Sequence, residues 1–229
     1  LTPEEDQELG RYNETARRAE APVWGQRAHM AIDYDKLLRL GTSGLRAQIE
    51  GYRARLDTAR PEELEKDAFY RACLIALDGL STFSERYAVH AEEMAARADS
   101  RRAMELYEIA NICRRVPEHP ATSFYEAMQA IHLVTFALCA SQMMLLFQLG
   151  RPDRYLLPYY ERDLKNGTID EAGAQELIDC LCMLFNVYTP RSLAVGFMVG
   201  GRDGSGKDIC NDLTRLFLRS IRHTRLAYP

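Results

Sequence analysis

The sequence predicts a mainly α-helical chain with about eight helices and one or two strands. Apolar residues recur at three- and four-residue steps through most of its length, which is the period of a helix buried on one side. Capping and breaking residues divide this pattern at short intervals. Only the segment 193–199 (LAVGFMV) is clearly typical of a strand, and 225–228 is a weaker candidate. Because two isolated strands cannot make a satisfied sheet, we expect their partner strands to lie outside this chain.

Helix caps define the elements of the N-terminal half. Thr2 begins a capping box that has proline at the first helical position. Asp33 can cap a helix that Gly41 stops, and Ser43 can cap the next one. Pro61 begins a long periodic stretch whose acidic start and arginine-bearing end suit the helix dipole. These signals predict a helix from residue 3 onward and further helices over 33–40, 43–57, 61–98 and 100–115, the last of them ended by Pro117 and Pro120.

The C-terminal half begins with the most apolar segment of the chain. Ser123 opens a second capping box, and no charged residue occurs over 127–149. This run is long enough for a membrane span, but glutamines, a histidine and hydroxyl residues interrupt it, and no basic flank or aromatic belt borders it. We therefore interpret it as a buried helix. Further helices are predicted over 153–166, ended by Gly167, from 168 to 186, and from a cap at Asp208 to 223.

Composition excludes several classes of function. The 229 residues carry a net charge of −4 and no basic block, so we expect neither nucleic-acid binding nor a membrane role. Six scattered cysteines favour a reducing cytoplasm. Cys180 and Cys182 are two apart on a predicted helix, so their side chains point apart and do not suit one zinc ion. We expect no signal peptide, and the apolar C-terminal end and late first methionine lead us to expect a chain cut at both ends.

A glycine-rich segment resembles known ligand-binding loops without completing them. Residues 201–208 (GRDGSGKD) nearly spell a phosphate-binding loop, but Asp208 replaces the hydroxyl residue that would hold magnesium. Its carboxylate would also face the negative charge of the nucleotide. A calcium loop is disfavoured too, because Lys207 would stand among the ligands. We therefore interpret the segment as a glycine turn followed by an aspartate helix cap.

The histidines offer one candidate contact residue. His90, His119 and His223 lie in polar surroundings, whereas His132 lies within the apolar helix, where a hydrogen-bonded core role is the simpler expectation. His29 differs because it lies in a loop before a helix, a common place for substrate contacts. The sequence contains neither a G-x-S-x-G elbow nor an H-E-x-x-H helix, which excludes two frequent hydrolase signatures.

Three motifs occur along the chain in a fixed order. They are 29–41 (HMAIDYDKLLRLG), 150–164 (GRPDRYLLPYYERDL) and 200–213 (GGRDGSGKDICNDL), with 112–117 (ICRRVP) and 123–129 (SFYEAMQ) between the first two. In this order and spacing they resemble glycyl radical enzymes of the pyruvate formate-lyase and glycerol or choline dehydratase type. The resemblance covers nearly the whole chain. One departure is Arg154, which stands where the family carries glutamine.

The resemblance implies that residues 1–229 are one partial domain of a larger enzyme. Its fold would be a ten-stranded α/β barrel wrapped in helices, commonly dimeric, and this chain would supply the helical part and the first barrel strands. In such enzymes an activating enzyme with S-adenosylmethionine and an iron–sulfur cluster makes a radical on a C-terminal glycine. The radical passes to a cysteine, whose thiyl abstracts hydrogen from a small-molecule substrate. The cysteine motif of the family, typically Gly-Cys followed by a hydrophobic residue or Glu, does not occur in this sequence, and neither does its glycyl loop, typically Arg-Val-x-Gly-Tyr or Phe. We therefore expect no catalytic residue, metal or bound cofactor in this chain, and no turnover by it alone.

The resemblance also places three residues at the substrate pocket. His29 matches a position where keto-acid lyases carry arginine and several dehydratases carry histidine. Arginine can clamp a carboxylate with two bonds, whereas histidine better serves a hydroxyl, so His29 disfavours pyruvate. Leu145 and Leu146 align with a His-Ser pair of polyol dehydratases. Leucines remove the partners that a polyol requires, which favours a less polar aromatic or alkyl substrate.

Two alternatives to an enzyme fragment remain open. The chain could be a non-catalytic helical interaction or assembly module derived from the family, which would bury its apolar helix and stay monodisperse. A nucleotide-binding domain around 201–208 would instead bind ATP, which a titration can test.

Overall fold

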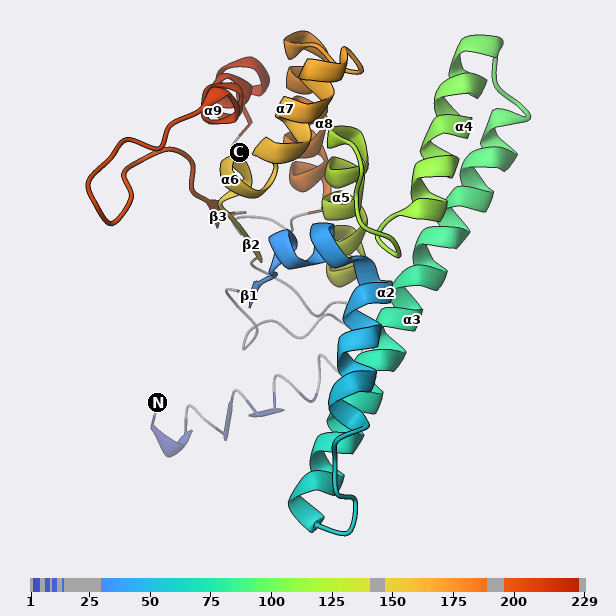
Figure 1. The fold of residues 1–229 in the computed structure, drawn as a ribbon, viewed down its shortest axis with the longest axis vertical. Coiled ribbons are helices and arrows are strands. Elements are labelled where there is room, and N and C mark those ends of the chain that lie inside the picture. The colour runs from blue at the N-terminus through green and yellow to red at the C-terminus, as the bar shows by residue number, and fades with distance from the viewer. Residues whose placement is uncertain are drawn as a thin grey trace.

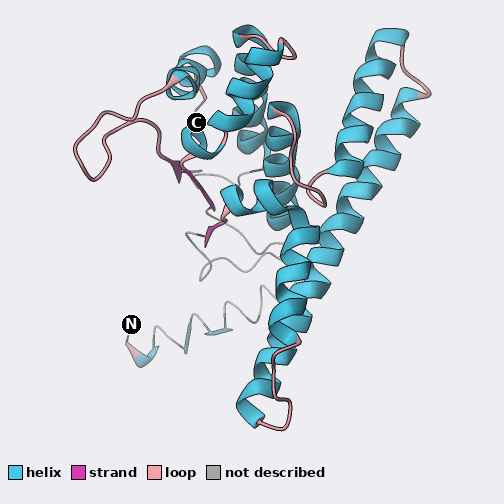
Figure 2. Cartoon of the chain, viewed as in Figure 1, coloured by secondary structure: helices cyan, strands magenta, loops and turns pink. Residues whose placement is uncertain are grey.

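The structure, a computed structural model, describes residues 30–140, 147–188 and 196–226, together with 2–4, 7, 8, 10, 11 and 14. Helices form most of it, as predicted, and a small group of strands lies at one side of them (Figures 1 and 2). The elements are, in chain order, β1 (Met30–Ala31), α2 (Tyr34–Arg53), α3 (Pro61–Ala95), α4 (Ser100–Arg115), α5 (Phe124–Ala140), β2 (Phe147–Gly150), α6 (Pro152–Tyr155), α7 (Leu157–Asn166), α8 (Glu171–Tyr188), β3 (Gly196–Phe197) and α9 (Asp212–Thr224).

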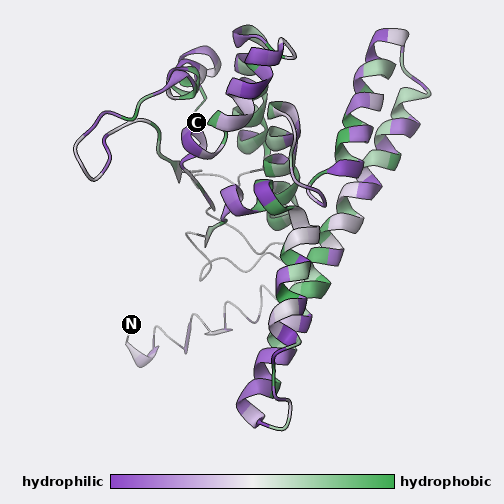
Figure 3. Cartoon of the chain, in the orientation of Figure 1, coloured by the Kyte–Doolittle hydropathy of each residue, from purple (hydrophilic) through white to green (hydrophobic). Residues whose placement is uncertain are grey.

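A long helix organises one side of the molecule. α3 begins at Pro61, as predicted, with α2 packed along its first half and α4 along its second (Figure 1). Alanines at 88, 91, 95 and 110 are buried between α3 and α4, and their small side chains let the two helices approach closely. Hydrophilic and hydrophobic residues alternate along both helices, as expected when one side is buried (Figure 3).

α2 is interrupted at Gly41, where the sequence predicts a helix end. Gly41 has φ +64°, and a Cβ atom there would collide with the carbonyl of Glu118. The close approach lets the Thr42 N–H donate to the Pro117 carbonyl at 2.8 Å. The prediction that Ser43 caps a new helix is wrong, because its hydroxyl donates to the Glu118 carbonyl at 2.7 Å. The interruption therefore fastens the segment between α4 and α5 onto α2.

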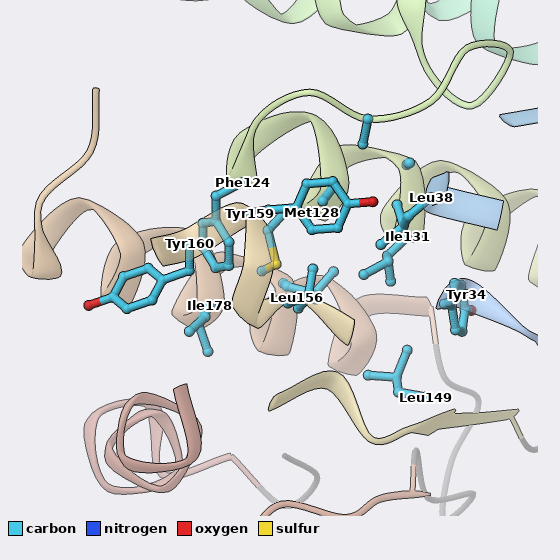
Figure 4. Packing of buried hydrophobic residues seen from close by; sticks show 14 of the residues in the cluster. Tyr34, Leu38, Phe124, Met128, Ile131, Leu149, Leu156, Tyr159, Tyr160 and Ile178 are labelled. Atoms are coloured by element: carbon cyan, nitrogen blue, oxygen red, sulfur yellow. The ribbon is translucent and has the colours of Figure 1, made fainter. Parts of the chain in front are cut away.

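The main core lies around α5. Phe124 and Ile131 of α5 are fully buried and meet Ile178 of α8 and Leu149 of β2 (Figure 4). The start of α5 is held by Asp163 of α7, whose buried carboxylate accepts the Phe124 N–H at 2.6 Å. A negative charge at this helix end also suits the dipole of α5. The core thus connects the helices to the strands that carry the candidate site.

The prediction that the uncharged run over 127–149 forms one buried helix is wrong. α5 ends at Ala140, and Phe147–Gly150 form β2, while 141–146 lie outside the described residues. An apolar run without a clear period fits a buried helix and a buried parallel strand equally well, so this change has no signature in the sequence. Among the described residues, no helix is long and apolar enough to cross a membrane.

Of the two predicted strands, 193–199 and 225–228, the first is confirmed. The segment 193–199 contains β3, with 193–195 outside the described residues. The prediction for 225–228 is wrong at its start, because Arg225 is the left-handed C-cap of α9; 227–229 are not described. The expectation that all partner strands lie outside the chain is also wrong, since β2 pairs with β3 and β1 pairs with β2. β1 was missed because two residues are too few to show the alternation of a strand.

Most predicted helix ends are confirmed. Asp33 caps α2 by accepting a backbone N–H, and Gly167 ends α7 in the left-handed conformation with φ 68°. The predicted helix over 153–166 is instead two helices that meet at Leu156. Pro158, in the first turn of α7, has no N–H to continue the hydrogen bonds of α6.

α9 begins later than predicted. Asp208 does not cap it, because its carboxylate accepts the N–H of Cys210 within the preceding loop at 2.9 Å. Asn211 is the cap, and it forms a capping box with Thr214. An asparagine followed by threonine serves the same purpose as the aspartate, so sequence alone does not distinguish the two positions.

Candidate functional site: the open face of the parallel sheet

Three short parallel strands lie side by side in the order β1-β2-β3. Met30 pairs with Phe147, Ala31 pairs with Gln148, and Gln148 in turn pairs with Gly196. The strands come from distant parts of the chain, and helices connect them, as parallel neighbours require. All three strands therefore begin at the same edge of the sheet.

The two faces of this sheet differ. On one face, Leu149 and Phe197 pack into the main core, and Figure 4 shows Leu149 among the core side chains. Successive side chains of a strand point to opposite faces, so the neighbours of these residues point away from the helices. We call this opposite side the open face; it consists of Ala31, Gln148, Gly196 and Met198. Met198 is 65% exposed there, although parallel sheets are normally covered on both faces.

A buried pair of tyrosines joins β1 to β2. Tyr34, just after β1, hydrogen-bonds Thr135 of α5 at 2.6 Å, and its ring stacks on that of Tyr155 with centroids 6.1 Å apart. The Tyr155 hydroxyl donates to the Leu149 carbonyl in β2 at 3.0 Å. Burial raises the pKa of both phenols, so they stay neutral hydrogen-bonding groups. The pair therefore positions the strands and supplies no acid or base.

A buried carboxylate fastens the far ends of β2 and β3. Oδ2 of Asp153 accepts the Gly200 N–H at 2.6 Å and the Thr214 hydroxyl at 2.7 Å. The Asp153 carbonyl accepts from Asn211 at 2.8 Å. Arg151 donates to the Gly200 carbonyl, and its Nε lies 3.8 Å from Oδ1 of Asp153. We call these five residues the Asp153 clamp, because they tie β2, β3 and α9 together.

The sequence did not predict the Asp153 clamp, although its parts lie in two of the three motifs. The available signal was Asp153 itself, which follows the uncharged run by only a few residues, after Arg151 and Pro152; a carboxylate that is fully buried there needs partners. Gly200 gives a second signal. Its φ is +66°, and a Cβ atom there would lie 2.9 Å from the Cys210 sulfur, so a side chain would push α9 away.

The predicted pocket residues precede the strands of this sheet. His29, Leu145 and Leu146 all lie outside the residues that the structure describes. In the chain His29 is followed by Met30 and Leu146 by Phe147, and these two following residues are register partners. The two predicted pocket segments therefore lead into adjacent parallel strands at one edge of the sheet.

The six cysteines are free thiols, and all belong to the described residues. They lie on α3, α4, α5, α8 and the loop before α9, and none lies in a strand. Burial raises the pKa of Cys113 and Cys139 to about 11, so both stay protonated at neutral pH. Cys180 is exposed whereas Cys182 is buried. Among the described residues, no group of three or more His, Cys, Asp or Glu could hold a metal.

The glycine-rich segment 201–208 is a turn closed on itself. Oδ1 of Asp203 accepts the N–H of Ser205 at 2.9 Å and that of Lys207 at 3.1 Å. Amides that would hold a phosphate are therefore already bonded to a carboxylate, which would also repel it. The predicted glycine turn is confirmed, and the geometry gives no support to nucleotide binding.

A hollow of about 610 Å³ lies among α3, α4, α5 and α8 and is lined mainly by apolar side chains. His132 of α5 lines it, with its ring stacked on Phe136 at a centroid distance of 6.0 Å. Burial lowers the pKa of His132 to about 4, so the ring is neutral at pH 7. Met183 and Val187 of α8 remain exposed beside it. The hollow lies among the helices, whereas the open face belongs to the sheet.

Comparison with known proteins gives consistent matches. Residues 3–229 match the family described as Pyruvate formate lyase-like. The isethionate sulfite-lyase of Nitratidesulfovibrio vulgaris is 35% identical over 213 residues, which are 86% of this chain and 26% of that protein. The (2S)-3-sulfopropanediol dehydratase of Klebsiella oxytoca is 32% identical over 88% of this chain and 26% of its own length. This chain thus spans about a quarter of the length of these relatives.

Solved structures agree with this match. The glycerol-bound B12-independent glycerol dehydratase of Clostridium butyricum superimposes with a TM-score of 0.80 at 31% identity, over 90% of this chain and 28% of that one. A glycyl radical enzyme of Archaeoglobus fulgidus gives 0.79 at 31% identity, over 89% and 28% of the two chains. The mainly helical fold with a small parallel sheet is therefore shared with part of these enzymes.

Removing the Asp153 carboxylate should loosen the sheet. The substitution Asp153→Ala leaves the Gly200 N–H and the Thr214 hydroxyl buried without an acceptor, so the free energy of unfolding should fall by about 3 kcal/mol. Urea unfolding measures the loss, and hydrogen exchange should quicken at the Gly200 amide. Asp212→Ala, on the exposed start of α9, should change stability by less than about 0.5 kcal/mol. Equal stabilities of Asp153→Ala and the unsubstituted chain would contradict the clamp.

The buried His132 should make stability depend on pH in a defined window. Its pKa falls from 6.5 to about 4 on folding, so the unfolded chain binds the proton more readily between these values. Stability should therefore decrease as the pH falls from 6.5 to 4, by up to about 3 kcal/mol. In His132→Gln this component should be absent, whereas exposed His119→Gln should keep it. Parallel stability curves for His132→Gln and the unsubstituted chain would show that the ring is not desolvated.

Proposed function

This chain belongs to the pyruvate formate lyase-like family, and we propose that it forms the N-terminal and middle part of the large domain of a glycyl radical dehydratase or lyase. One observation carries the proposal: among the described residues, three parallel strands have helices on one face and the exposed Met198 on the other. A barrel wall has this arrangement, with helices outside and the substrate space inside. The chain would supply the helical layer and the first strands of a ten-stranded α/β barrel.

In the complete enzyme, the radical chemistry would come from residues other than these 229. The family's reaction uses a glycyl radical, installed by an activating enzyme with S-adenosylmethionine and an iron–sulfur cluster, and a cysteine thiyl that abstracts hydrogen. The cysteines present do not fit that role, since none follows a glycine, as the radical cysteine of the family typically does. We therefore assign no reaction step to this chain and expect it to be inactive alone.

The role of this chain would be to shape the substrate pocket. We propose that His29 donates or accepts a hydrogen bond with a hydroxyl of a small-molecule substrate, and that Leu145 and Leu146 provide apolar wall. Their place in the chain supports this, because both segments lead directly into register partners of the sheet. A histidine and two leucines at these positions favour a substrate with few polar groups over a keto acid or a polyol.

The same proposal implies a cellular compartment and protein partners for the complete enzyme. The complete enzyme would act in the cytoplasm, where its thiols stay reduced, with the activating enzyme as partner and a second copy forming a homodimer. The six free cysteines of the chain agree with a reducing compartment.

A non-catalytic helical module is the second candidate. Exposed apolar side chains beside the hollow, such as Val187 at 79% exposure, would suit an assembly partner as well as they suit the remainder of an enzyme. The two candidates differ in radical chemistry, because only the enzyme forms a glycyl radical when its activating enzyme is supplied.

The enzyme proposal is tested by the protein expressed from its full reading frame under strict exclusion of oxygen. After activation, electron paramagnetic resonance should detect a glycyl radical, and the radical should disappear from a preparation limited to residues 1–229. Absence of the radical from the longer protein would favour the helical module.

Replacing His29 by alanine in the activated enzyme should lower kcat/KM about tenfold or more, because the proposed hydrogen bond to the substrate is lost. The radical yield and the thermal midpoint should stay unchanged. His119→Ala, on the exposed segment before α5, is the matched control and should keep full activity. Unchanged turnover in His29→Ala would overturn its assignment to the pocket.

A further inference from the structure

The open face carries one uncharged polar side chain among the described strand residues, that of Gln148. Gln148 lies in the middle strand, between Ala31 of β1 and Gly196 of β3. Its sequence neighbour Leu149 is 1% exposed on the opposite, helix-covered face. Strand alternation therefore directs the Gln148 amide away from the core.

The amide of Gln148 lies across β3, over Gly196. A Cβ atom on Gly196 would lie 2.5 Å from Oε1 and 2.8 Å from Nε2 of Gln148, too close for an ordinary contact, so the amide would have to move. The φ of Gly196 is not in the left-handed region, so its backbone does not require glycine. Glycine at this position instead leaves room for the amide to lie flat on the sheet.

The surroundings of the amide define what it can recognise. The hydrogen bonds found among the described residues include none made by the side-chain amide of Gln148. Its neighbours on the open face, Ala31 and Met198, are apolar and uncharged. An amide offers both donors and an acceptor without charge, which suits a hydroxyl group better than an anion, for which arginine is the stronger ligand.

We propose that Gln148 is a substrate-binding residue that hydrogen-bonds a hydroxyl group of the substrate, with Gly196 as the positioning residue that keeps its amide flat on the open face. This rests on the proposed function, because the open face lines a substrate space only if the sheet is part of the barrel. Gln148 would be a polar contact on the apolar open face, in addition to the one proposed for His29, and it selects small hydroxylated molecules over non-hydroxylated acids.

The test uses the activated enzyme from the full reading frame and six substrates: glycerol, 1,2-propanediol, isethionate, (2S)-3-sulfopropanediol, trans-4-hydroxy-L-proline and, as the member without a hydroxyl, indoleacetate. For the best hydroxylated substrate, Gln148→Ala should lower kcat/KM about tenfold, mainly through KM, with an unchanged glycyl radical signal. Gln48→Ala, an exposed glutamine on α2, should behave like the unsubstituted enzyme.

A double-mutant cycle tests the role of Gly196. Gly196→Ala should lower kcat/KM to a similar extent, because its new methyl group displaces the amide. It should cause no further loss in the Gln148→Ala background, since two changes that act through one contact are not additive. Additive losses would show that Gly196 acts only on the fold and would overturn its positioning role.

The remaining outcomes separate this proposal from the one on which it depends. A radical signal with full activity in Gln148→Ala would overturn the role of Gln148 and leave the enzyme proposal intact. A radical signal with turnover of indoleacetate alone would overturn the hydroxylated substrate class. Absence of the radical from the unsubstituted protein would overturn the enzyme proposal, and this inference with it.

Discussion

A parallel sheet is stable only when both of its faces are covered, and this requirement governs the whole structure. The strands of this chain have two to four residues, too few to hold together through their own hydrogen bonds. Side chains hold them instead: the Tyr34–Tyr155 pair joins β1 to β2, and the Asp153 clamp joins β2 to β3 and α9. The described helices cover one face, and on the other face Met198 stays exposed.

The Asp153 clamp shows why separate motifs of the chain form one unit. Arg151 and Asp153 follow β2, while Gly200 follows β3, so two motifs that are distant in sequence meet at one edge of the sheet. The predicted pocket residues precede β1 and β2 at the other edge. Helix packing and strand register are therefore coupled through a few buried hydrogen bonds, each of which is lost if its partner moves.

Much of the helical fold was predictable because caps and breakers are local. Asp33, Gly41 and Gly167 act within one turn of the backbone, and the sequence signals each of them. β2 was not predictable, because its uncharged residues continue those of α5 and only tertiary pairing makes them a strand. The site was predictable only in part. The resemblance led to His29 and the two leucines, whereas Gln148 emerged from the register that places it over Gly196.

The central claim is that the open face becomes an interior surface in the complete protein, and oxidation of Met198 tests it most directly. Brief exposure to hydroxyl radicals should oxidise Met198 readily in residues 1–229, where it is 65% exposed, and Met128, 3% exposed, should be protected and serve as the reference. In the protein from the full reading frame, mass spectrometry should find Met198 protected to the level of Met128. Equal oxidation of Met198 in the two proteins would contradict the barrel-wall account.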